Sequence, residues 1–160
     1  MKKLFYICMV ACLAVFGFAS CEPEGLVDDT PVTGHPEQDA AGVYVGTWTR
    51  VLEKDTTVAE GLVTLVADTT YFVSVEVDAV SAVGLSKMTS LANITQDSYF
   101  GTKFFNNGGA NNGFGTSFSG KTFTNAEGKE AVSLWFKLTV KSGRKSYEYN
   151  FNFDGVKTEE

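Results

Sequence analysis

Histidine and cysteine are nearly absent from the part of this chain that can form a folded domain. Its three cysteines all lie within the first 21 positions. The single histidine, His35, follows a glycine and precedes a proline, in a stretch whose composition predicts disorder. These absences argue against a disulfide, a thiolate metal site or a Ser-His-Asp triad within residues 42–160. We therefore expect no metal and no cofactor.

Clustered basic residues are lacking as well. The formal net charge is −6, and it becomes −8 when residues 1–20, which carry two lysines and no acid, are removed. Contacts to nucleic-acid phosphates need grouped lysine and arginine side chains. The acidic balance therefore predicts no nucleic-acid partner.

The first twenty residues have the pattern of a secretory signal, because a lysine pair precedes an apolar run over residues 4–18 that is too short to span a bilayer comfortably. The following Ala-Ser-Cys resembles a bacterial lipobox, with Phe18 where leucine is most common. The resemblance implies that Cys21 is acylated and becomes the first mature residue. We expect a cell-envelope protein held in the outer membrane through Cys21, facing the periplasm or the outside. The alternative is an ordinary secretory signal that leaves Cys21 as a free thiol.

Residues 21–41 predict a flexible acidic spacer. They contain all three prolines and six acidic residues, without one lysine or arginine. Such a segment buries too little apolar surface to order itself, and its mean reach is on the order of 25 Å. Acid directly after Cys21 also resembles export signals of surface lipoproteins in Bacteroidetes-type bacteria. The chain is thus expected to comprise a signal (1–20), a lipidated spacer (21–41) and a folded domain (42–160).

The periodicity of residues 42–160 is two, which is typical of strands. In residues 131–140 five apolar side chains alternate with polar ones and one tryptophan, and residues 146–154 alternate tyrosine and phenylalanine with polar residues. Ser142-Gly143 between them predicts a hairpin turn. The expected strands are 43–52, 57–67, 70–78, 91–95 after an irregular crossing from residue 80, 98–105, 114–123, 131–140 and 146–154. Residues 106–113, rich in asparagine and glycine, predict a connecting loop.

Eight antiparallel strands with short connections predict an all-β, up-and-down barrel, because closure removes exposed strand edges. The alternative is a β-sandwich, since a local pattern does not distinguish one closed sheet from two packed sheets.

Three short motifs carry a family resemblance. The first strand reads Gly-x-Tyr-x-Gly-x-Trp from Gly42 to Trp48, the middle contains Leu-Ala-Asn-Ile at residues 91–94, and the last strand closes with Phe-x-Gly-x-Lys at residues 153–157. Together they are similar to the calycin-like, lipocalin-related barrel lipoproteins of Bacteroidetes. The resemblance implies that Trp48 packs near the barrel closure with a basic residue across its ring. We expect Lys157 in this role, with Arg50 and Arg144 as alternatives. The pair would stabilise the barrel and bind no ligand.

Two functions remain open for such a barrel. It could hold a small apolar ligand in its interior, or its interior could be filled so that only its surface interacts with an unknown protein partner. The residues expected to line a ligand are Tyr71, Val73, Val75, Phe136, Leu138, Tyr149 and Phe151.

An enzyme would need paired carboxylates, because histidine and metal ligands are scarce. Glu76 with Asp78 and Glu148 with Asp154 are the available pairs, and both lie on polar strand faces. We therefore expect no enzyme. Trp135 is predicted to point outward, either as a platform for a sugar or partner or as an isolated exposed ring.

Overall fold

The computed structural model describes residues 34–97, 100–114 and 117–159. The signal, Cys21 and the first part of the predicted spacer lie outside the described residues, so lipidation stays a prediction.

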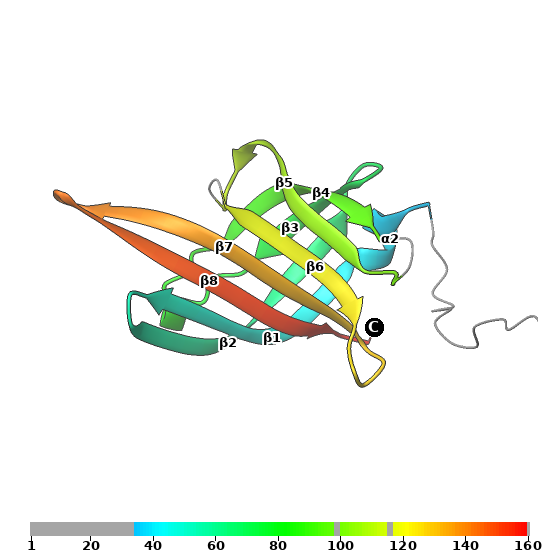
Figure 1. Ribbon diagram of the computed structural model, residues 1–160, viewed down its shortest axis with the longest axis horizontal. Coiled ribbons are helices and arrows are strands. Elements are labelled where there is room, and N and C mark those ends of the chain that lie inside the picture. The colour runs from blue at the N-terminus through cyan, green and yellow to red at the C-terminus, as the bar shows by residue number, and fades with distance from the viewer. Residues whose placement is uncertain (1–33, 98–99, 115–116, 160) are drawn as a thin grey trace, which may run out of the picture.

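Eight strands follow one another along the chain, and each pairs antiparallel with the next (Figure 1). The last strand returns to pair with the first, which closes the barrel. The predicted eight-stranded up-and-down barrel is therefore confirmed, and the alternative sandwich is wrong. The strands are β1 (Gly42–Leu52), β2 (Asp55–Ala67), β3 (Phe72–Val77), β4 (Met88–Gln96), β5 (Lys103–Asn112), β6 (Phe118–Thr124), β7 (Glu130–Ser142) and β8 (Lys145–Lys157).

Alternation along each strand decides which side chains enter the barrel. On β3, Val73, Val75 and Val77 are fully buried, while Ser74 and Glu76 between them remain partly exposed. β7 repeats the pattern with a buried valine, leucine and phenylalanine. The two-residue periodicity thus predicted the inner face of both strands.

The β7–β8 hairpin extends past the rest of the barrel at one end, which we call the hairpin end (Figure 1). Ser142 pairs with Lys145, and Gly143 has a φ of 62° in the turn between them. The predicted hairpin is present, with its turn one residue later than expected. Val140 follows the inward alternation but is 48% exposed, because the hairpin extends beyond the strands that would otherwise cover this side chain.

The predicted loop at residues 106–113 is wrong. Residues 103–112 form β5, which pairs with β4 through a register shift between Ser90 and Ala92. Ladder hydrogen bonds join backbone groups, so neighbouring strands can impose pairing on a stretch of poor strand formers. Correspondingly, β6 begins at Phe118 instead of at residue 114.

Two short helical segments were not predicted. The helix α2 (Pro36–Ala40) lies at the barrel end opposite the hairpin, against β2 and β4, and we call this the α2 end (Figure 1). The 3-10 turn η1 (Ser81–Val83) lies in the connection from β3 to β4. Because Glu37 and Ala40 are buried, the expectation of a disordered spacer up to residue 41 is wrong for its last part. The folded unit already includes α2.

Candidate functional site

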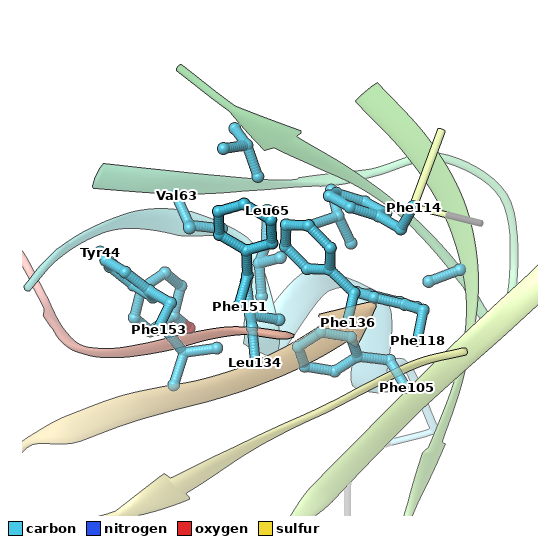
Figure 2. Close-up of a cluster of buried hydrophobic side chains, with 14 of the residues drawn as sticks. Tyr44, Val63, Leu65, Phe105, Phe114, Phe118, Leu134, Phe136, Phe151 and Phe153 are labelled. Carbon is cyan, nitrogen blue, oxygen red and sulfur yellow. The ribbon is translucent and has the colours of Figure 1, made fainter. Parts of the chain in front are cut away.

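Aromatic side chains fill the interior of the barrel (Figure 2). Phe136 lies among them, with its ring centroid 5.2 Å from that of Phe151, 4.8 Å from that of Phe114 and 5.8 Å from that of Trp48. Phe114 in turn stacks on Phe118 at 4.7 Å. These centroid separations are those of rings in direct contact. The inner space that a ligand would use is therefore taken by the protein's own side chains.

Most of the predicted ligand-lining residues do face this interior. Val73, Val75, Phe136 and Phe151 are buried, and Leu138 and Tyr149 pack partly buried against the same cluster.

Tyr71 is the exception, and its predicted place inside the barrel is wrong. Its side chain is 50% exposed, and its φ of 64° breaks the strand alternation before β3 begins. The backbone of Tyr71 is held instead, since its N–H donates to Glu37 Oε2 at 3.1 Å and its carbonyl accepts from Ile94 N–H at 2.8 Å. A left-handed residue in a turn is not visible in a hydrophobic pattern.

The hairpin end is covered by the connection that contains η1. Val83 and Leu85 are buried there, and the Arg50 guanidinium donates to the Val83 carbonyl at 3.1 Å and to Thr57 Oγ1 at 3.0 Å. The central carbon of this guanidinium group, Cζ, lies 5.7 Å from the centroid of the Tyr149 ring. A depression of about 260 Å³ remains beside them. The sequence interpretation described this connection as irregular and missed that it covers the barrel.

The α2 end is closed by polar contacts. The Tyr44 hydroxyl, fully buried, donates to the Ala40 carbonyl at 2.8 Å. Burial, and then the nearby Glu130 carboxylate, raise the pKa of Tyr44. Burial acts against ionisation of Glu37, but hydrogen bonds from its own N–H, from Tyr71 N–H and from His35 outweigh it and lower the pKa of Glu37. His35 thus orients a carboxylate, at 3.1 Å from Glu37 Oε1, which corrects its predicted place in a disordered stretch.

An ion cluster lies beneath α2. Lys157 Nζ contacts Glu130 Oε2 at 2.9 Å and donates to the Asp39 carbonyl at 3.1 Å, and Lys103 Nζ lies 3.9 Å from Glu130 Oε1. Lys103 is only 9% exposed, which nothing in its sequence context predicted. The two ammonium groups share the single Glu130 carboxylate, so the cluster carries one more positive than negative charge.

Trp48 and Lys157 both lie on the seam between β1 and β8, but not against each other. Tyr44 pairs with Lys157 along the seam, and Trp48 pairs with Phe153. Lys157 Nζ lies 6.0 Å from the Tyr44 ring centroid, and the Trp48 ring packs on Phe153 at 4.9 Å. The cation expected across Trp48 therefore lies over Tyr44, four positions earlier on the same strand.

The predicted acid pairs lie on the outer surface. Asp78 is 3.8 Å from Lys87, and Glu148 is 3.1 Å from Lys137. Exposed ion pairs of this kind contribute little to stability. Within the described residues, no three histidine, cysteine or acidic side chains gather in a way that could hold a metal ion.

Comparisons with known proteins found no relative of this chain. No family model, no curated protein and no solved structure matches the chain. Among the described residues there is also no helix long and apolar enough to cross a membrane.

Proposed function

We propose that this protein is a non-catalytic, calycin-like envelope lipoprotein whose barrel binds through its outer surface. The observation that carries the proposal is the filled interior, in which Trp48, Phe114, Phe136 and Phe153 are all fully buried. α2 covers one end of this interior and the η1 connection covers the other. A barrel filled in this way is a rigid support for surface groups, and it leaves little room to carry a ligand inside.

The anchor in this proposal is a lipid on Cys21. The lysine pair, the short apolar run and the small residues before Cys21 support it. Each buried CH₂ of an acyl chain contributes about 0.8 kcal/mol to membrane binding, so several chains together hold a protein firmly.

Replacing Cys21 by alanine is expected to release the protein from the membrane fraction, because the apolar run before it is too short to act as an anchor once the lipid is lost. The measurement is fractionation of cells, followed by an alkaline wash of the membranes and immunoblotting. A variant that still sediments with washed membranes would contradict the anchor. Protease added to intact cells then distinguishes exposure at the surface from a periplasmic location.

The second candidate function is a container for a small apolar ligand, which the partly covered depression beside Arg50 favours. Phe136→Trp separates the two functions. In a filled barrel the larger ring overpacks the core, and we expect unfolding free energy to fall by about 1 to 3 kcal/mol. Palmitate should then leave the thermal midpoint of the wild-type chain from Gly34 onward unchanged.

Val58→Trp is the matched control, because Val58 is 59% exposed on β2 and does not line this depression. An open interior would give the reverse result. Palmitate would raise the wild-type midpoint in proportion to RT ln(1 + [L]/Kd), and Phe136→Trp would weaken that binding while the fold stayed stable.

A further inference from the structure

Four neighbouring strands present a mixed aromatic and polar surface, which we call the outer sheet face. β5, β6, β7 and β8 lie side by side there (Figure 1). Their register aligns outward side chains in two adjacent rows across the strands. One row is Asn106, Ser119, Trp135 and Asn152, and the next row is Phe104, Lys121, Ser133 and Asp154.

Two aromatic rings flank a hollow on this face. Phe104 is 48% exposed and Trp135 is half-buried. Between them is a depression of about 270 Å³ whose remaining lining comes from Ser119, Gly120, Lys121, Ser133 and Leu134. Strand spacing places the Cα atoms of the two aromatic residues roughly 12 Å apart. That span is comparable to the length of a disaccharide.

Small and polar residues form the floor and rim of the hollow. Gly120 lies at the floor, and its neighbours Ser119 and Ser133 carry hydroxyl groups. Asn106 and Asn152 add amide groups at the two ends of the Trp135 row. Each amide supplies both donors and acceptors, and each hydroxyl can do either.

The charges around the hollow balance. Lys137 is paired with Glu148 at 3.1 Å, and the rows themselves carry one lysine and one aspartate. The Lys121 ammonium lies 5.1 Å from the Phe123 ring centroid, which holds it at the rim. The whole chain is acidic, so this neutral face favours an uncharged ligand over a polyanion or a polycation.

We infer that the outer sheet face binds a neutral carbohydrate in the hollow between Trp135 and Phe104. A sugar ring has one apolar C–H face, which packs on an aromatic ring, and a rim of hydroxyl groups that need hydrogen-bond partners. The hollow offers both kinds of contact on a rigid sheet, so little ordering is needed on binding. The inference rests on the proposed function, because it assigns binding to the outer surface of a filled barrel.

The test uses the full-length protein in a detergent without a sugar headgroup. Maltohexaose, cellohexaose and chitohexaose are titrated by calorimetry and by tryptophan fluorescence. We expect at least one of them to bind at millimolar or lower concentration and to change the emission. Trp48 is fully buried, so the change should come from Trp135 and should disappear in Trp135→Phe.

Variants decide whether the two rings form the site. Trp135→Ala and Phe104→Ala should each weaken binding about tenfold, and Trp135→Tyr should retain most of it. Phe100→Ala is the matched control, because Phe100 is 69% exposed outside this face, and it should bind as the wild type does.

Two results would overturn the inference: binding of none of the three neutral oligosaccharides, or binding that both alanine variants leave unchanged. Each of them leaves the proposed function standing if Cys21→Ala still leaves the membrane and Phe136→Trp still overpacks the core. The failure of the carbohydrate site and the failure of the anchored, filled barrel are therefore distinguishable.

Discussion

Trp48→Ala is expected to lower the free energy of unfolding by about 3 to 5 kcal/mol. Trp48 is fully buried, and its ring meets Phe136 edge-on at 5.8 Å and Phe153 at 4.9 Å. Its removal leaves a cavity on the seam that closes the barrel. No described residue accepts a hydrogen bond from the buried indole Nε1, and losing this group offsets part of the effect. We therefore expect a value toward the lower end of the range.

Urea unfolding followed by circular dichroism measures this loss. Trp135→Ala is the control, because Trp135 is half-buried on the outer sheet face, and its loss should be clearly smaller. Equal and small losses in the two variants would contradict the packing of Trp48 at the closure.

Gly46→Ala is expected to lower the free energy of unfolding by about 3 kcal/mol, the upper end of what overpacking usually costs. A Cβ atom at this position would overlap the Asp154 carbonyl and the Gly155 Cα of β8. Gly46 and Gly155 face each other in the β1–β8 register. The obstacle is backbone, which cannot rotate away as a side chain can, so β1 and β8 would have to separate.

Thermal and urea unfolding of Gly46→Ala should be compared with Gly34→Ala. A Cβ atom at Gly34 meets no atom of the described residues within 4 Å, so that variant should unfold as the wild type does. Amide exchange adds a local readout, since protection along β1 and β8 should fall more than protection along β3 and β4. Wild-type stability in Gly46→Ala would show that the seam does not need this close approach.

Large rings of the interior lie over glycines of their own or neighbouring strands, which the sequence pattern did not reveal. A Cβ atom at Gly61 would meet the Trp48 ring, and one at Gly120 would meet the Phe105 ring. From the sequence alone, a glycine in a strand indicates only a weak point or a close approach. Which ring covers it depends on register, and register is a property of the paired strands.

Where a strand has one apolar and one polar face, its alternation was enough to predict it. β3, β7 and β8 were recognised in this way, because burial of one face follows directly from the two-residue period. The same reasoning failed at β5, where asparagine and glycine indicate a turn. Pairing with β4 through backbone hydrogen bonds decided that segment instead.

The candidate site, too, was predictable from the sequence only in part. The outward direction of Trp135 follows from its place between buried neighbours on β7, so alternation alone predicted it. Its proximity to Phe104, which lies about thirty residues earlier, follows only from the β5–β6–β7 register.

By itself the sequence determined the all-β class, the eight-strand count, the inner face of the regular strands and the acidic, cysteine-free character of the folded domain. These properties depend on local periodicity and composition, which neighbouring residues alone specify. Only the tertiary structure decided that Lys157 lies over Tyr44, that Tyr71 faces outward, and that α2 belongs to the barrel. Each of these depends on contacts between segments far apart in the chain, where pairing and closure override the preferences of short stretches.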